Sequence, residues 1–326
     1  MISIERSRPQ TSDGWRLDVR CYRHEAAFDV TKPPLLFIPG YGMNSFILGY
    51  HPSDVSMVEY LASCGHEVWT ANLRGQGDAY THGTKDIGFA QLALIDIPTV
   101  RDHALAHTQT EHQRVVWIGC SLGASMLYAY FAHHPNDHAA WSMIAIGGPL
   151  RWNKVHPLLK VAFRSPKLAS LVPFKGTRKL AQLALPVVRH IPDALSIYMN
   201  ARRIDLSEPH MMTQTVDDPV PWLNLQIAHW IHQRELRVDG VTVSDVLSTI
   251  DDVPILCVIA NKDGIVPPET ALSVLDVMPA PHSEVIVAGD DRHWYAHADL
   301  FIGQDARRHV FEPMANWIED FGWSNA

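Results

Sequence analysis

The chain has 326 residues and a formal net charge of −8 at pH 7, and 47% of its residues are hydrophobic. That composition is typical of globular proteins, while the negative charge argues against nucleic-acid binding, which usually requires a basic surface. No run of about 18 apolar residues predicts a membrane span, and the first residues lack the charged and apolar segments of a secretory signal.

The first half of the chain alternates between predicted strands and helices. A hairpin with Asp13-Gly14 at its turn opens the chain. An apolar run then ends at Pro39-Gly40, as expected for a strand buried on both faces of a parallel sheet. The elements that follow are a helix at 55–62, a strand at 66–72, a helix at 95–107, a strand at 115–119, a helix at 122–133 and a strand at 141–147. This alternation predicts an α/β fold with a doubly wound, mostly parallel sheet.

The alternation is interrupted after residue 149. Residues 150–250 contain helical stretches rich in proline and aromatic residues, with no clear central strand. The alternation resumes with a strand at 253–260, a helix at 267–277, a strand at 284–289 and a helix at 307–321. We therefore predict a core domain made of residues 1–149 and 251–326, interrupted by a helical insertion at 150–250.

Apolar residues of the insertion suggest where a binding pocket could form, and the cysteines indicate the cellular compartment of the protein. The inserted helices carry apolar residues that would form either their own core or a pocket for an apolar group: Phe163, Leu171, Phe174, Leu183, Met199, Met211, Met212, Trp222 and Trp230. The cysteines lack metal-binding spacing and predict free thiols in a reducing cytoplasm: Cys21, Cys64, Cys120 and Cys257.

The motif GCSLG at residues 119–123 joins a predicted strand to a predicted helix. The pattern G-x-S-x-G places its central serine on a sharp strand-to-helix turn, and its glycines keep the strand and the helix from colliding. The register therefore selects Ser121 as the nucleophile. Cys120 is expected to point into the fold, and Ser125 to lie about one helical turn further on.

A serine nucleophile needs a base that accepts its proton and an acid that orients the base. Asp263 follows the strand at 253–260 and is the predicted acid, although Lys-Asp-Gly is also common in plain turns. Asp251 and Asp252 precede that strand and are weaker candidates.

The base should follow the last strand, where His293 and His297 both lie. The chain contains 19 histidines, so a single histidine carries little weight. Position in this loop narrows the choice to these two residues, and spacing alone does not separate them.

The oxyanion formed in acyl transfer needs two N–H donors. One is expected from Leu122, the residue after the nucleophile, and the other from Tyr41 in the loop after an early strand. Gly40 and Gly42 flank Tyr41 and let this backbone approach a substrate closely.

Together these residues resemble the α/β-hydrolase superfamily, and within it the lipase- and esterase-like serine hydrolases with a helical cap. The resemblance covers nearly the whole chain and rests on IPGYGMNS (38–45), NLRGQGDA (72–79), VVWIGCSLGAS (115–125), ANKDGIVPP (260–268) and HADLFIGQDA (297–306). The last segment is similar to the His-x-Asp pattern that carries the base in lipase-like members, which favours His297 over His293. The resemblance also implies that residues 150–250 form the cap or lid of such enzymes.

Three features qualify this resemblance. Pro39 stands where the family usually has a histidine, so a side chain that supports the oxyanion loop is missing. Cys120 replaces the usual histidine before the serine. Residues 235–271 are also similar to polyhydroxyalkanoate synthases, whose elbow nucleophile is a cysteine, and Ser121 therefore favours hydrolysis over polymerisation.

The sequence thus predicts a serine hydrolase that cleaves a small-molecule carboxylic ester with an apolar acyl group, using Ser121, His297 and Asp263. An acyltransferase or a thioesterase would use the same triad. Dehalogenases and epoxide hydrolases of this fold carry an aspartate at the elbow, so Ser121 argues against them. A non-enzymatic binding protein is the remaining alternative. We expect no cofactor and no metal, and the sequence leaves the oligomeric state open.

Overall fold

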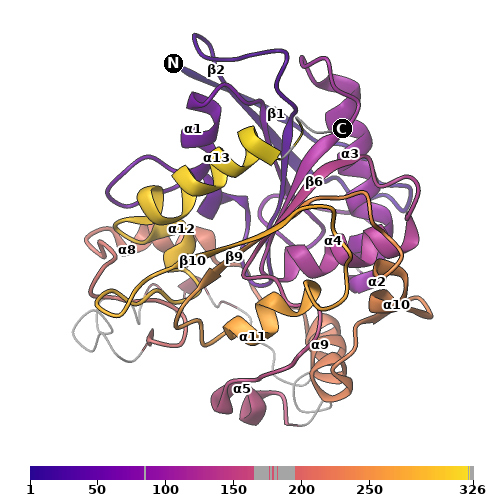
Figure 1. The fold of residues 1–326 in the computed structure, drawn as a ribbon, viewed down its shortest axis with the longest axis vertical. Coiled ribbons are helices and arrows are strands. Elements are labelled where there is room, and N and C mark those ends of the chain that lie inside the picture. Colours follow the sequence, from indigo (N-terminus) through magenta and orange to yellow (C-terminus); the bar gives the residue numbers. More distant parts are fainter. Residues whose placement is uncertain are drawn as a thin grey trace.

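A single eight-stranded sheet runs through the molecule and carries helices on both faces (Figure 1). The computed structural model describes residues 1–83, 86–164, 176, 178–179, 182, 195–321 and 323. The strands of the sheet are β1 (Ile2–Ser7), β2 (Asp18–His24), β3 (Leu35–Ile38), β4 (Val68–Asn72), β5 (Val115–Cys120), β6 (Ala140–Ile146), β9 (Ile255–Ala260) and β10 (Ser283–Ala288).

The strand order across the sheet is β1-β2-β4-β3-β5-β6-β9-β10. β2 pairs antiparallel with both β1 and β4, and the remaining neighbours pair parallel. The chain enters the sheet at one edge with β1 and β2, places β3 on the inner side of β4, and then extends the sheet toward the other edge with β5, β6, β9 and β10. The predicted doubly wound, mostly parallel sheet is therefore confirmed, as is the hairpin that opens the chain.

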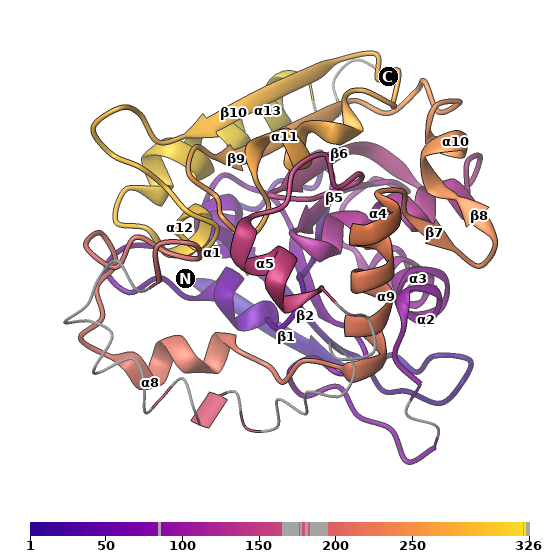
Figure 2. The same ribbon diagram turned by 90° about the horizontal axis from the view of Figure 1, so that it is seen from below.

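The helices connect these strands and cover the sheet. They are α1 (Met57–Ser63), α2 (Phe89–Gln91), α3 (Ile97–His107), α4 (Leu122–His133), α5 (Pro157–Ala162), α8 (Pro209–Met212), α9 (Pro221–Gln233), α10 (Val243–Leu247), α11 (Pro268–Ala271), α12 (Asp299–Ile302) and α13 (Glu312–Phe321). Seen from below, α5 and α9 lie in front of the sheet, and α8 lies to one side of it (Figure 2). A separate two-stranded sheet is formed by β7 (Arg237–Val238) and β8 (Val241–Thr242).

The sheet separates two hydrophobic cores, and β3 shows how. Its side chains alternate between faces: Leu36 and Ile38 belong to the core beneath α3 and α4, whereas Leu35 and Phe37 belong to the core beneath α1 and α13. All four are fully buried. An apolar run without alternation is what a strand covered on both faces requires, so burial on both sides explains why this segment has no polar residue.

The helix expected at 267–277 is shorter in the structure. α11 ends at Ala271, and a 3₁₀ turn, η5 (Leu272–Val274), follows it. Two hydroxyl groups explain the change: Thr270 Oγ1 donates to the Lys154 carbonyl, and Ser273 Oγ donates to the Thr270 carbonyl. Hydroxyls that bond to nearby carbonyls compete with helix hydrogen bonding. Contacts with the segment after β6 therefore set the end of this helix.

Helix α4 crosses the loop that follows β3 at very short range. A Cβ atom added at Gly123 would lie only 2.1 Å from the Ile38 carbonyl oxygen, which belongs to rigid backbone. The helix can approach β3 this closely because residue 123 has no side chain.

We predict that Gly123→Ala lowers the free energy of unfolding by about 2 kcal/mol or more, because the added methyl group forces α4 away from β3. Gly83→Ala is the matched control, since only the Thr81 hydroxyl lies within 4 Å of a Cβ atom there. Urea denaturation of both variants measures the difference. Equal stabilities would contradict the close-packing argument.

Candidate active site

Ser121 occupies the turn between β5 and α4 with a strained backbone. Its φ is 52° and its ψ is −123°, a conformation that residues with a side chain rarely adopt. A Cβ atom at Gly119 would lie 2.4 Å from Ala124 Cα, so only glycine fits two residues before the serine. The turn therefore has the geometry that the G-x-S-x-G spacing predicts.

The other two nucleophiles of this stretch are held inside the protein. Cys120 is fully buried among apolar residues, and this burial raises the pKa of its thiol. Ser125 is also fully buried, and its hydroxyl donates to the Pro149 carbonyl at 2.6 Å. Ser121, in contrast, lines a pocket. Position and accessibility thus separate the three side chains as the sequence pattern predicts.

Asp263 and His297 form a buried hydrogen-bonded pair. Asp263 lies just after β9, and its Oδ2 is 2.6 Å from His297 Nδ1. Its Oδ1 accepts hydrogen bonds from the Ile265 and Val266 N–H groups, each at 2.8 Å. With a carboxylate on Nδ1, the ring proton is held there and Nε2 is left as an acceptor.

Gly147, which follows the last residue of β6, packs against Asp263 and His297. A Cβ atom added to it would lie 3.0 Å from His297 Cε1 and 3.6 Å from Asp263 Oδ2, so its backbone packs directly against the pair. Its φ is 58°, which favours glycine.

The competing candidates from the sequence lie elsewhere. His293 has an exposed side chain near Asp290, with Nδ1 at 3.6 Å from its Oδ1. Asp251 and Asp252 are exposed before β9, and Asp252 Oδ1 lies 3.6 Å from His138 Nε2. Of the two histidines that spacing left open, the structure brings only His297 to Asp263.

The loop after β3 packs against the turn between β5 and α4 that carries Ser121. A Cβ atom at Gly40 would lie 2.7 Å from the Cys120 carbonyl oxygen and 2.8 Å from Ser121 Cβ. Tyr41 and Leu122 both line the pocket beside Ser121. Among the described residues, neither the Tyr41 N–H nor the Leu122 N–H donates a hydrogen bond. Their roles as oxyanion donors stay a prediction.

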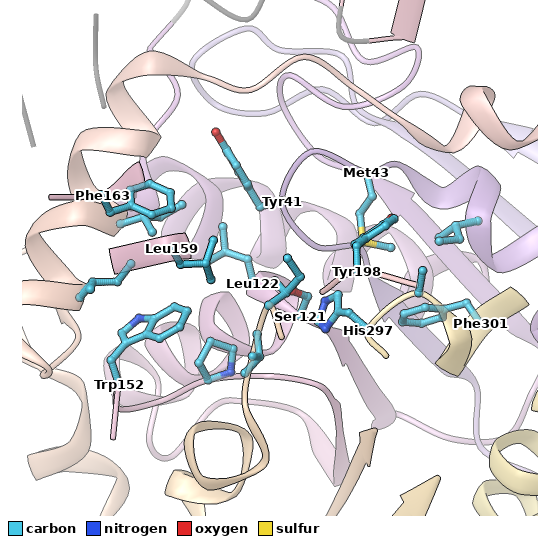
Figure 3. Close-up of a pocket in the computed structure, with 17 residues that line it drawn as sticks. Tyr41, Met43, Ser121, Leu122, Trp152, Leu159, Phe163, Tyr198, His297 and Phe301 are labelled. Atoms are coloured by element: carbon cyan, nitrogen blue, oxygen red, sulfur yellow. The ribbon is translucent and has the colours of Figure 1, made fainter. Parts of the chain in front are cut away.

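Ser121 and His297 lie at the centre of a pocket of about 310 Å³ (Figure 3). Met43, Tyr198 and Phe301 lie on one side of them, and Trp152, Leu159 and Phe163 lie on the other. The further lining residues are Tyr41, Ile47, Leu122, Pro149, Ile227, Ile231, Ile265, Val266 and Ala298. The lining is almost entirely apolar, and burial raises the pKa of its Tyr198 hydroxyl to about 12, which keeps that group neutral.

The apolar residues that the sequence singled out in the inserted segment occupy different environments in the structure. Phe163 lines the pocket. Met199, Met212 and Trp230 are buried in the two cores, Met211 is half-buried, and Trp222 is 55% exposed. Leu171, Phe174 and Leu183 lie outside the described residues. Pocket-lining residues that the sequence did not single out include Trp152, Leu159 and Tyr198, which come from loops or a short helix without a diagnostic period.

Residues 197–200 connect the loop of Asp263 to the loop of His297. The Ile197 carbonyl accepts a hydrogen bond from the Gly264 N–H at 3.1 Å, next to Asp263. The Tyr198 carbonyl accepts a hydrogen bond from the Ala298 N–H at 2.8 Å, next to His297. One turn-forming segment thus holds both loops.

Asp299 is a second buried carboxylate at this junction. It accepts hydrogen bonds from the Asn200 N–H at 2.9 Å and from the Ala296 N–H at 2.7 Å. Its pKa is raised to about 7, chiefly by burial and to a smaller extent by the charge of Asp263, while the N–H groups of Ala296 and Asn200 and the charge of Arg203 oppose the rise. No sequence signal beyond the His-x-Asp pattern pointed to this residue.

Comparison with known proteins agrees with the geometry. A sequence profile of the α/β-hydrolase fold matches residues 33–297. The match spans most of the chain, and the protein belongs to the α/β-hydrolase family. The resemblance inferred from the sequence is therefore confirmed. No curated protein sequence matches the chain significantly.

Solved structures show the same fold at low sequence identity. An esterase from Exiguobacterium antarcticum is 17% identical with a TM-score of 0.61, covering 96% of this chain and 99% of that one. An esterase from Rhodococcus sp. ECU1013 is 16% identical with a TM-score of 0.60, covering 98% and 100%. A bacterial membrane phospholipase A is 15% identical with a TM-score of 0.59, covering 99% and 87%.

Membrane-spanning helices and metal-binding clusters are both absent from the described part of the chain. None of its helices is both long and apolar enough to cross a membrane. Its histidine, cysteine and carboxylate side chains form no group of three that could hold a metal ion.

We predict that Asp299 makes stability fall as pH rises from about 4 to about 7. Its folded pKa of about 7 exceeds its ordinary value of 3.8, so in this window the folded protein binds a proton that the unfolded chain has released. That stabilising contribution is complete near pH 4 and is lost as pH approaches 7. The free energy of unfolding of the wild type should therefore fall relative to that of Asp299→Asn over this range.

Urea denaturation at pH 4.5, 6.0 and 7.5 measures this difference. Asp290→Asn is the control, because hydrogen bonds from His293 and Arg292 lower the pKa of the exposed Asp290 and it does not titrate in this window. If the free energies of unfolding of the wild type and Asp299→Asn change with pH in parallel, Asp299 does not titrate between pH 4 and 7.

Proposed function

We propose that the protein hydrolyses carboxylic esters with an apolar acyl group through an acyl-enzyme on Ser121. The observation that supports this most is that two residues line one pocket: Ser121 on its strained turn, and His297, which is hydrogen-bonded to Asp263 behind it. Membership of the α/β-hydrolase family and a fold shared with esterases add to it.

In the first step, Ser121 Oγ attacks the ester carbonyl carbon while His297 Nε2 takes the hydroxyl proton. The carbonyl oxygen becomes an oxyanion, and the N–H groups of Tyr41 and Leu122 stabilise it. The bond from the carbonyl carbon to the alcohol oxygen then breaks, and the proton on His297 passes to the departing alcohol. Asp263 stabilises the imidazolium form between these transfers.

In the second step, water attacks the acyl carbon and gives a proton to His297. The bond to Ser121 Oγ breaks, the carboxylic acid leaves, and the proton returns to the serine. The enzyme ends unchanged, and no cofactor is consumed. An acyltransferase would differ only in using an alcohol in place of water.

The pocket supports an apolar substrate. Residues of α5 and α9, including Leu159, Ile227 and Ile231, line it together with core residues such as Ile265 and Phe301. Burying apolar substrate surface there gains roughly 25 cal/mol per Å². We retain residues 150–250 as the cap because α5 and α9 lie within them. Toward its end, however, Leu236 and Leu247 pack in the same core as α4.

We predict that Ser121→Ala lowers kcat for a p-nitrophenyl ester by at least about ten-thousandfold, because the nucleophile is lost. Labelling by a fluorophosphonate should disappear with it. Ser125→Ala is the control and should keep both ester hydrolysis and fluorophosphonate labelling, because the Ser125 hydroxyl is buried and donates to the Pro149 carbonyl.

Retained turnover or retained labelling in Ser121→Ala would place the chemistry elsewhere. Product analysis with and without added alcohol separates hydrolysis from transfer: we expect free carboxylic acid in both cases. A new ester formed at the expense of the acid would assign the protein as an acyltransferase.

We predict that Leu159→Trp shifts the preference of the enzyme toward shorter acyl chains, because the larger side chain fills the pocket. The measurement is kcat/KM for p-nitrophenyl esters graded in acyl length. Leu158→Trp is the matched control, since Leu158 lies next to it on α5 but is 62% exposed. A flat length profile in the wild type, or the same shift in both variants, would contradict an acyl-binding pocket.

A further inference from the structure

The Gln76 side chain reaches from the turn after β4 to the loop that carries Tyr41. Its Nε2 donates to the Gly40 carbonyl oxygen at 2.8 Å, and its Oε1 accepts from the Leu73 N–H at 3.0 Å. The residue is buried, with 8% of its surface exposed. Because one neighbour can only donate and the other can only accept, the amide group has one possible orientation.

The turn that holds Gln76 is itself rigid. The Gln76 N–H donates to the Leu73 carbonyl at 3.0 Å. Arg74 is fully buried, and its guanidinium binds Asp96 at 2.7 Å and Asp13 at 2.7 Å. A charged network therefore fixes the backbone from which Gln76 projects.

The Gly40 carbonyl and the Tyr41 N–H belong to one peptide unit. This unit is planar and trans, so its carbonyl and its N–H point in opposite directions. A hydrogen bond that fixes the carbonyl therefore also fixes the direction of the N–H. Gly40 has no side chain to restrain it otherwise, and a Cβ atom added to it would lie 2.8 Å from Ser121 Cβ.

We propose that Gln76 is a positioning residue that holds the Gly40 carbonyl so that the Tyr41 N–H faces the oxyanion at Ser121. The inference rests on the proposed function, because it assigns the support of the oxyanion donor in that reaction. It also accounts for Pro39, which stands where the resembling family usually has a supporting histidine. In this protein the oxyanion loop is supported by Gln76, which lies after β4 and not in the loop itself.

The test is Gln76→Glu, which keeps the shape of the side chain but replaces the N–H donor with a carboxylate oxygen at high pH. We expect kcat for a p-nitrophenyl ester to fall on the order of tenfold to a hundredfold at pH 8.5, with KM little changed, because only the transition state carries the oxyanion. Gln113→Glu makes the same chemical change at an exposed position and should leave kcat unchanged.

Lowering the pH provides a second readout that a purely structural role would not produce. Once protonated, the introduced carboxyl group has an O–H that can donate to Gly40 and a C=O that can accept from Leu73, so it mimics the amide. The ratio of kcat in Gln76→Glu to kcat in the wild type should therefore rise as pH falls from 8.5 to 5.5. The corresponding ratio for Gln113→Glu should stay flat.

Several outcomes would overturn the proposal. One is a Gln76→Glu enzyme as active as the wild type at pH 8.5; another is a loss of activity without recovery at low pH. If the variant does not fold, a structure of the wild-type phosphonate adduct decides. Its phosphoryl oxygen should lie within hydrogen-bonding distance of the Tyr41 N–H while Gly40 stays bonded to Gln76. A wild type that neither hydrolyses esters nor reacts with the phosphonate would instead refute the proposed function.

Discussion

Ser121 holds a backbone conformation with φ of 52° that costs free energy, on the order of 1–3 kcal/mol for a residue with a side chain. Such a conformation persists only where neighbouring structure leaves no alternative. Here Gly119 and Gly123 allow β5, α4 and the loop after β3 to meet at distances that any side chain would prevent. The close packing of three backbone segments thus sustains the strain, and the strain turns the serine toward the pocket.

The segments around this turn are held by hydrogen bonds that come from distant parts of the sequence. Gln76, after β4, bonds to the loop after β3. The carbonyls of residues 197 and 198 bond to the loops after β9 and β10. Each loop lies at the carboxyl end of a parallel strand, where ligand sites of open α/β sheets form. The sheet brings these loops together, but side-chain and main-chain contacts between them set their final positions.

The fold was predictable because its strands are short apolar runs buried on both faces, as Leu35–Ile38 illustrates. The turn at Ser121 was predictable because steric limits leave few sequences that can form it. The contact between Asp263 and His297 was only partly predictable. His293 follows the same strand, and spacing does not reveal which of the two histidine rings points into the protein. Trp152 and Tyr198 were not predictable as lining residues, because tertiary hydrogen bonds, such as that from Ala298 to Tyr198, place them.

Polar and apolar groups of the site are separated in space. The carboxylates of Asp263 and Asp299 face backbone N–H groups beneath the pocket, while the pocket wall is almost wholly apolar. Asp263 also receives the imidazole, whereas the donors to Asp299 in the described part of the chain are the backbone N–H groups of Asn200 and Ala296. Burial is the largest cause of the raised pKa of Asp299. For the proposed reaction, this wall favours selection of a substrate by shape and by the burial of its apolar surface, because few polar atoms in the wall could recognise a polar group.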